Sequence, residues 1–149
     1  MHGETVGRPM ELLLVEDSLS DVHVTAMALR RANIAHRLMI ARTGEEAIDF
    51  LYRRGIFAQA PRPDLILLDL RLPRMDGQEV LDMVKADFDL KDIPVVVMTM
   101  SRDEEDLVRC QLHNVDAYVT KPVDLEKFMD LVRELKRFWH EDMILPQKA

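Results

Sequence analysis

The stretch that decides the fold is Asp64-Leu65-Ile66-Leu67-Leu68-Asp69-Leu70-Arg71-Leu72-Pro73-Arg74-Met75-Asp76-Gly77. Its aliphatic run at 65–68 has no polar face, which is typical of a strand buried on both sides in a parallel sheet. Asp69 ends this run, and Pro73 prevents the strand from continuing. A buried charge without a partner is costly, and ligands of open α/β sheets bind beyond the carboxyl ends of the strands. Asp69 is therefore the first candidate for chemistry.

The rest of the chain repeats this alternation of an apolar strand and an amphipathic helix. We expect strands at 11–15, 36–40, 65–68, 94–98 and 117–120, and helices after Ser18 or Ser20, from Thr43, from Gly77, over 103–112 and after Asp124. Strict alternation predicts a parallel sheet with helices on both faces. Right-handed crossovers and the small size favour an α/β, doubly wound, five-stranded sheet of order 2-1-3-4-5, which is a flavodoxin-like three-layer αβα fold. A Rossmann dinucleotide-binding fold competes, but no G-x-G-x-x-G follows the first strand.

Length and composition exclude several classes of function. The 149 residues suit one domain, for which we expect a loose N-terminal segment at 1–9, a domain at 10–140 and a tail at 141–149. A net charge of −7 argues against a nucleic-acid partner. No apolar run approaches the roughly 18 residues of a membrane span, and the first ten residues lack the apolar core of a signal peptide. With the single cysteine Cys110 no intrachain disulfide is possible, which suits the cytoplasm. Cys110 and His113 are too few ligands for a metal site.

Polar and charged residues stand at the ends of four predicted strands: Glu16 and Asp17, Asp69, Thr99, and Lys121. Parallel strands bring these ends to one edge of the sheet. Three carboxylates at one place repel each other unless a cation joins them, and oxygen ligands suit a hard ion such as Mg²⁺. A hydroxyl and an ammonium facing that ion can take two oxygens of a phosphoryl group. The set therefore predicts phosphoryl transfer, with Asp69 as a possible nucleophile.

With these motifs the sequence resembles the receiver domain of two-component response regulators. The resemblance rests on Glu16-Asp17, the run from Asp69 to Gly77, Thr99 and Lys121-Pro122, and it covers residues 10 to about 138. It implies that Asp69 is the phosphoacceptor and that Asp17 binds Mg²⁺ directly. It also implies that Glu16 binds the ion largely through water and that the backbone carbonyl of Arg71 completes the protein ligands.

The resemblance further implies how the site would signal. Thr99 and Lys121 would contact the phosphoryl group and move on activation, and the ring of Tyr118 would turn inward when Thr99 moves. Lys121-Pro122 resembles the family's cis peptide, and X-Pro bonds carry little cis penalty.

The chain departs from the family's pattern at three positions. Glu16 replaces the commoner aspartate, which lengthens the arm and keeps the charge. Arg71 puts a large cation where smaller groups are frequent, and Met100 follows Thr99 where small residues are frequent. A bulky Met100 would narrow access to Asp69 or hinder the inward swing of Tyr118. The alternative is that it fills a gap in the loop, as flexible methionines do.

A narrower resemblance concerns stand-alone receivers partnered with phytochrome-type light-sensing histidine kinases. It rests on Thr99-x-Ser101, on Phe138-Trp139 and on Leu145-Pro146. It implies a histidine kinase as partner, and no effector domain follows in the sequence, so we expect output by conformational change and protein contact. On this reading the protein is a phosphoacceptor and not an enzyme in the usual sense.

Two other functions compete with the signalling module. A Mg²⁺-dependent phosphatase acting through an aspartyl phosphate typically carries a second acid two residues after its nucleophile, and here that position is Arg71. A degenerate receiver would only bind, but the site residues are intact.

The last helix leads us to expect a homodimer. Its core stripe is Leu125, Phe128, Val132, Leu135 and Trp139. Further apolar residues remain off this stripe and would be exposed together on a lone domain, which predicts a two-fold interface or a tail folded back on its own domain: Met129, Phe138, Met143, Ile144 and Leu145.

Overall fold

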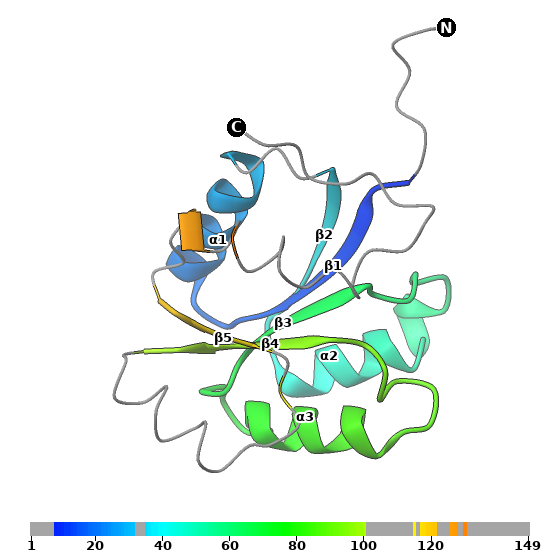
Figure 1. Cartoon of the computed structure of the whole chain (residues 1–149). Helices are drawn as coiled ribbons and strands as arrows, with labels where there is room; N and C mark the ends of the chain where they lie inside the picture. The colour runs from blue at the N-terminus through cyan, green and yellow to red at the C-terminus, as the bar shows by residue number, and fades with distance from the viewer. Residues whose placement is uncertain are drawn as a thin grey trace, which may run out of the picture.

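A computed structural model describes residues 8–31, 35–100, 115, 117–121, 126–127 and 130. Within these residues five parallel strands form one sheet in the order β2-β1-β3-β4-β5 (Figure 1). The strands are β1 (Met10–Val15), β2 (His36–Ala41), β3 (Leu65–Asp69), β4 (Val95–Thr99) and β5 (Ala117–Thr120). This order confirms the predicted doubly wound, flavodoxin-like sheet.

The described helices begin where the sequence predicts caps. They are α1 (Leu19–Arg31), α2 (Gly44–Leu51) and α3 (Gly77–Ala86), with a short 3₁₀ helix η1 (Gly55–Phe57) after α2. The side chains of Thr43 and Asp76 cap α2 and α3, each accepting the N–H of the residue three positions on, at 3.0 and 2.9 Å. Ser18 is the cap of α1, since its hydroxyl accepts the Asp21 N–H at 3.3 Å.

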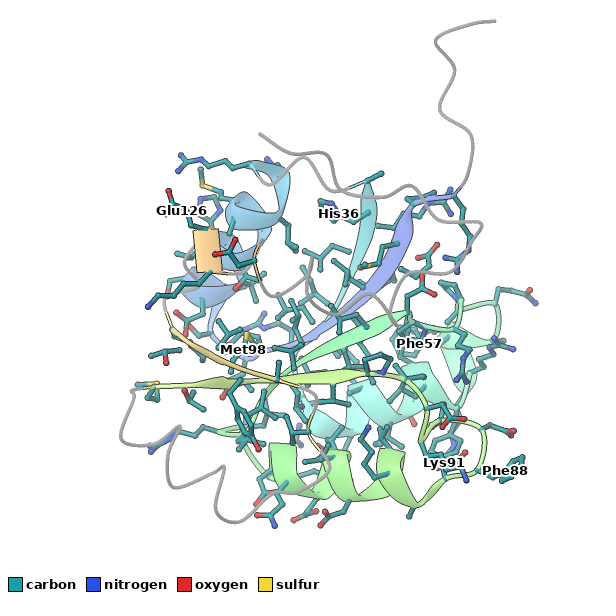
Figure 2. All side chains as sticks on the ribbon, viewed as in Figure 1. His36, Phe57, Phe88, Lys91, Met98 and Glu126 are labelled. Atoms are coloured by element: carbon teal, nitrogen blue, oxygen red, sulfur yellow. The ribbon has the colours of Figure 1, made fainter. Side chains whose placement is uncertain are left out.

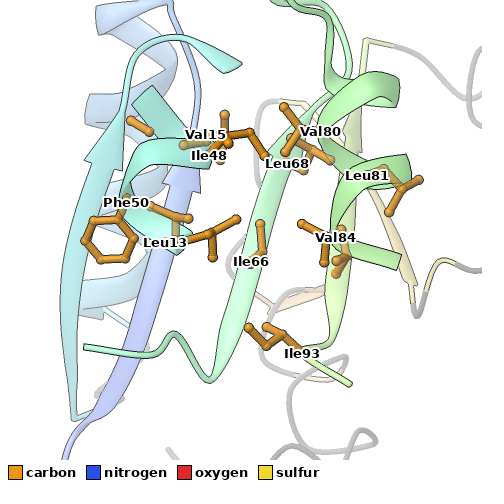
Figure 3. Close-up of a cluster of buried hydrophobic side chains, with 14 of the residues drawn as sticks. Leu13, Val15, Ile48, Phe50, Ile66, Leu68, Val80, Leu81, Val84 and Ile93 are labelled. Atoms are coloured by element: carbon orange, nitrogen blue, oxygen red, sulfur yellow. The ribbon is translucent and has the colours of Figure 1, made fainter. Parts of the chain in front are cut away.

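The strand β3 is buried on both faces, as its aliphatic run predicts. Leu65 and Leu67 pack in the cluster that includes α1, and Ile66 and Leu68 pack in the cluster that includes α2 and α3. All four side chains are 1% exposed. Figure 3 shows the second cluster, in which Leu13 and Ile66 on neighbouring strands lie between α2 and α3. One central strand therefore joins two cores and fixes the position of Asp69 at its end.

The strand β2 lies at the edge of the sheet and is only partly covered. The sequence places Leu38 and Ile40 on one face. Leu38 packs against the α1 cluster, whereas Ile40 is 39% exposed. An edge strand has a neighbouring strand on one side only, so apolar residues of its inward face, such as Ile40, can lie beyond the packed core.

At the N-terminal end of the strands, Arg8 of the N-terminal segment pairs with Asp64. Two nitrogens of Arg8 contact the two carboxylate oxygens of Asp64 at 2.7 and 2.9 Å. Asp64 also accepts the Glu11 N–H at 2.8 Å.

The expected helix at 103–112, most of the last helix and the tail at 141–149 lie outside the described residues, although Glu126, Lys127 and Asp130 are helical.

In the described part of the chain no helix has both the length and the apolar character to span a bilayer.

Candidate functional site

The sheet brings the predicted residues to one edge because its strands are parallel. Glu16 and Asp17 directly follow β1, and Asp69 is the last residue of β3. Asp69 pairs in register with Met98 on β4, which is labelled in Figure 2, so Thr99 lies one residue further along the same edge. Lys121 follows β5, and its amide donates to the Thr99 carbonyl at 2.7 Å.

The Lys121 ammonium lies among carboxylates from different elements. Its Nζ is 2.7 Å from Glu16 Oε2 and 2.9 Å from Asp69 Oδ2. The side chains of Glu16 and Asp69 are 1% and 5% exposed, and that of Lys121 is 10% exposed. A buried charge needs a partner, and here one cation after β5 pairs with two anions at the ends of β1 and β3. The cluster of like charges that the sequence predicts therefore exists, with a lysine inside it.

The carboxylates form a group that fits a divalent cation. Glu16, Asp17 and Asp69 each offer an oxygen, and these oxygens lie within 4.8 Å of one another. Glu16 Oε2 is buried and, although it is close to Lys121, accepts no hydrogen bond of good geometry from the described residues. An all-oxygen set of this charge suits a hard ion. The donor chemistry and the incompletely satisfied oxygen agree with divalent cation binding.

Burial and the neighbouring charges shift two pKa values in the site. Burial raises the pKa of Glu16 to about 7, and its contact with Asp69 also raises it, while Lys121 and the Ser18 amide lower it. Burial lowers the pKa of Lys121, but the Glu16 and Asp69 carboxylates outweigh burial and raise it above its usual value. The lysine is therefore firmly protonated, and burial disfavours the ionised form of Glu16.

The turn after β3 is built closely around Asp69. Asp69 Oδ1 accepts the Arg71 N–H at 2.9 Å, which fixes the carboxylate plane. The Gly77 amide donates to the Leu70 carbonyl at 2.9 Å. A Cβ at Gly77 would lie 2.3 Å from the Asp69 carbonyl oxygen, so α3 can begin this close to the acid only at a glycine.

Two residues of the site were missed in the sequence analysis. Asp21, in the first turn of α1, places Oδ2 3.2 Å from Lys121 Nζ. Arg42 lies just after β2 and donates from its guanidinium to the Asp17 carbonyl at 2.8 and 3.3 Å. Asp21 could have been found from its spacing, because it lies four residues after Asp17 and one turn into the helix. The Arg42 contact is to a backbone atom, which sequence pattern does not reveal.

The remaining predicted residues lie near this edge with different exposures. Thr99 is 1% exposed, and Tyr118 is half-buried and packs against the cluster that includes α2 and α3. Arg71 is exposed, and Met100 is 56% exposed. The predicted roles of Thr99 and Tyr118 as switch residues, and of the Arg71 carbonyl as a metal ligand, remain predictions.

Several predicted residues lie outside the described part of the chain. They include the second residue of the expected cis peptide and the whole of the expected dimer interface, together with the cysteine and histidine of the rejected metal pair: Pro122, Met129, Phe138, Met143, Ile144, Leu145, Cys110 and His113.

Comparison with known proteins identifies the family. Residues 12–133 match the family model of the response regulator receiver domain. The response regulator Rcp1 of Synechocystis sp. is 43% identical over 138 residues, which are 93% of this chain and 94% of Rcp1. Its Mn²⁺-bound crystal structure superposes with a TM-score of 0.70 at 44% identity, covering 93% of this chain and all of that one.

Two further solved structures share the fold at similar identity. The bacteriophytochrome response regulator RtBRR gives a TM-score of 0.82 at 38% identity, covering 93% of this chain and 83% of RtBRR. The phosphorylated cyanobacterial phytochrome response regulator RcpA gives 0.71 at 40% identity, covering 93% of this chain and 99% of RcpA. The family match over residues 12–133 includes the strand ends that carry Glu16, Asp17, Asp69 and Lys121, so this chain belongs to the response regulator receiver domain family.

Proposed function

We propose that Asp69 is the phosphoacceptor of this receiver domain and that Lys121 and Thr99 hold the phosphoryl group. The observation that carries the proposal is the position of the Lys121 ammonium, 2.9 Å from Asp69 Oδ2 and 2.7 Å from Glu16 Oε2. It places a fixed positive charge beside the acid that would react. Transfer of a phosphoryl group needs such a charge, because negative charge spreads over the phosphoryl oxygens in the transition state.

The transfer is a displacement at phosphorus. A carboxylate oxygen of Asp69 forms a bond to the phosphorus of a phosphohistidine, and the P–N bond breaks. The imidazole leaves with that electron pair and is protonated from solvent. The Arg71 amide on Oδ1 and the Lys121 ammonium on Oδ2 keep the Asp69 carboxylate oriented before the donor arrives. Water attack at phosphorus later releases phosphate and restores the carboxylate, so the cycle consumes no side chain.

The cation of the site would be Mg²⁺, held by Asp17 and Asp69 directly, by Glu16 largely through water and by the Arg71 carbonyl. Mg²⁺ supplies neutralisation of the charge shared by the carboxylates and the phosphoryl oxygens. The support is the group of three carboxylates with oxygens within 4.8 Å, together with the Mn²⁺ named for the Rcp1 structure. Arg42 contributes by holding the backbone carbonyl of Asp17, which limits where the side-chain carboxylate of Asp17 can reach.

The partner would be a histidine kinase of the phytochrome type, acting in the cytoplasm, and the output would be a change of protein contacts. The support is the agreement of three relatives over more than nine-tenths of this chain, two of which are named as phytochrome or bacteriophytochrome response regulators. Thr99 and Tyr118, on adjacent strands β4 and β5, would carry the change from the site to the surface. The protein would be a phosphoacceptor that takes part in its own phosphorylation and dephosphorylation.

Loading with a small phosphodonor tests the proposal. The wild-type protein is incubated with phosphoramidate and Mg²⁺, and the intact mass is followed with time. We expect one phosphoryl adduct that hydrolyses slowly, no adduct when Mg²⁺ is chelated, and none for Asp69→Asn. A phosphoryl adduct on Asp69→Asn under the same conditions contradicts the assignment.

Asp17→Asn and Asp82→Asn form the matched pair for the cation. Both remove one carboxylate, but Asp82 is exposed on α3 and belongs to no described acidic cluster. We expect Asp17→Asn to weaken Mg²⁺ binding by at least about tenfold, as loss of a direct ligand does, and Asp82→Asn to leave it unchanged.

In the phosphodonor experiment, steady release of phosphate without accumulation of a phosphoryl adduct would favour the competing phosphatase function.

A further inference from the structure

We propose that Asp21 is a positioning residue, which keeps the Lys121 ammonium at the mouth of the site when the cation and the phosphodonor bind. This inference rests on the proposed function. Asp21 Oδ2 lies 3.2 Å from Lys121 Nζ, and the Asp21 side chain is 35% exposed. The other two partners of this ammonium, Glu16 and Asp69, are buried. Asp21 therefore holds the lysine from the solvent side.

Asp21 is set apart from the cation-binding acids. The described acidic group comprises Glu16, Asp17 and Asp69, and Asp21 does not belong to it. The backbone of Asp21 is held in the first turn of α1, because the Ser18 hydroxyl accepts the Asp21 N–H. Asp21 Oδ2 thus contacts the lysine, while Asp21 is not among the described acids that could share a cation.

The three contacts of Lys121 would not all survive cation binding. An ammonium has three N–H donors, and here three carboxylates lie within 3.2 Å of it. A divalent cation competes for the oxygens of Glu16 and Asp69, which are two of the three partners. Asp21 is the partner that the cation leaves in place. Without it, the long flexible side chain of Lys121 loses its outer anchor as the phosphodonor arrives.

This geometry separates binding of the cation from transfer of the phosphoryl group. In the transfer, an Asp69 oxygen bonds to phosphorus while the bond from phosphorus to the donor nitrogen breaks. Lys121 then meets charge on the phosphoryl oxygens. A displaced lysine slows this step and leaves the cation ligands as they are.

For Asp21→Asn we expect phosphorylation by phosphoramidate to be about fivefold slower than in the wild type, the effect of a partly exposed charge pair. We expect the Mg²⁺ dissociation constant to change less than about threefold, since the removed charge is no ligand.

The experiment follows the phosphoryl adduct by intact mass for the wild type, Asp21→Asn, Asp21→Glu and the control Asp82→Asn, with Mg²⁺ affinity measured by calorimetry. Asp21→Glu should be phosphorylated at a rate within about twofold of the wild-type rate, because it keeps the carboxylate. The same Asp21→Asn change is then made in a Lys121→Ala background. We expect no further slowing there, because the lysine through which Asp21 acts is gone.

A second readout does not depend on the folding of the Lys121→Ala protein. In Mg²⁺-loaded protein labelled with ¹⁵N-lysine, the Lys121 ammonium signal should be resolved in the wild type and lost to water exchange in Asp21→Asn. An equal slowing with and without Lys121, an unchanged rate in Asp21→Asn, or an unchanged ammonium signal overturns the inference. Failure of the proposed function looks different, since the wild type itself would then form no adduct.

Discussion

Gly77 shows how much a single residue position contributes to the site. A Cβ there would meet the Asp69 carbonyl oxygen at 2.3 Å and the Leu70 Cα at 2.4 Å. Both are main-chain atoms of the strand end and cannot rotate away as a side chain would. Since the Asp69 carboxylate also accepts a hydrogen bond from the Arg71 amide, any shift that relieves the contact moves this carboxylate.

We predict that Gly77→Ala destabilises the protein by about 2 kcal/mol or more, as overpacking against rigid atoms does, and weakens Mg²⁺ binding as well. Urea unfolding and calorimetry measure the two effects. Gly55→Ala is the control, because Gly55 has φ +54° but nothing within 4 Å of its added Cβ. It should cost about 1 kcal/mol of backbone strain and leave Mg²⁺ binding intact. Normal Mg²⁺ affinity in Gly77→Ala would contradict the proposed coupling.

At the scale of elements, two connections hold the end of the sheet opposite the site. One joins the chain before β1 to the residue before β3 through Arg8 and Asp64. The other joins the C-terminal end of α2 to the loop after α3, because the Tyr52 hydroxyl donates to Asp87 Oδ2 at 2.8 Å. This second contact borders a cavity of about 400 Å³, lined by Leu51, Tyr52, Arg53, Arg62, Pro63, Asp87, Asp89 and Leu90. Phe88 and Lys91 project from the same loop (Figure 2).

The Arg8 contact predicts where N-terminal truncation becomes harmful. Removal of residues 1–7 keeps the Arg8–Asp64 pair, whereas removal of residues 1–9 deletes it and should cost about 1–3 kcal/mol more. The reason is that Asp64 is 8% exposed and would lose the guanidinium that contacts both of its carboxylate oxygens. Arg8→Ala should reproduce the loss. Arg37→Ala is the control, since Arg37 reaches Glu11 at 3.6 Å with a side chain that is 70% exposed. Equal melting temperatures for the two truncations would mean that the pair does not stabilise the fold.

The Tyr52–Asp87 contact predicts a pH dependence. The hydrogen bond from Tyr52 lowers the pKa of Asp87 from 3.8, and the same hydrogen bond, with burial, raises the pKa of Tyr52 from 10.0. The Asp87 contribution is therefore present above pH 3.8 and is lost as pH falls through its lowered folded value. The Tyr52 contribution is present below pH 10.0 and is lost as pH rises through its raised folded value.

Comparison with Tyr52→Phe measures this contact. The stability difference between the two proteins should be constant between about pH 5 and 9 and should shrink toward both extremes. Chemical unfolding at a series of pH values provides the measurement. Asp87→Asn should remove the acid limb of this dependence. A difference that grows as pH falls below 3.8 would have the wrong sign for this pair.

At the scale of the whole molecule, the expected homodimer remains a prediction. Its motive is the surplus of apolar residues near the C-terminus, where burial of each side chain is worth about 1.5–3 kcal/mol before the cost of association. We predict that the full chain sediments as a dimer at micromolar concentration and that a chain ending at Arg137 sediments as a monomer. A full chain that remains monomeric, with and without phosphorylation, would instead favour a tail folded on its own domain.

The sequence predicts the sheet and the strand-end residues well for one reason. A parallel strand buried on both faces is a continuous aliphatic run, and the polar residue that ends it marks the site, as Asp69 does. Contacts made from outside the strands do not follow this pattern. The first-turn acid of α1, Asp21, is indistinguishable by composition from an acid that favours the helix dipole. Arg8 is an ordinary surface arginine until Asp64 is placed beside it.

The order of the strands has a consequence for folding. Lys121 is 52 residues from Asp69 and 100 from Asp21 along the chain, and it follows the edge strand β5. Contacts of such sequence separation form late, because the loop between them must close first. Until β5 docks, the four acids around this position face each other without their lysine. The competence to receive a phosphoryl group is thus coupled to completion of the sheet, and a chain that has lost its last strand would carry the acids but not the charge that makes them a receiver.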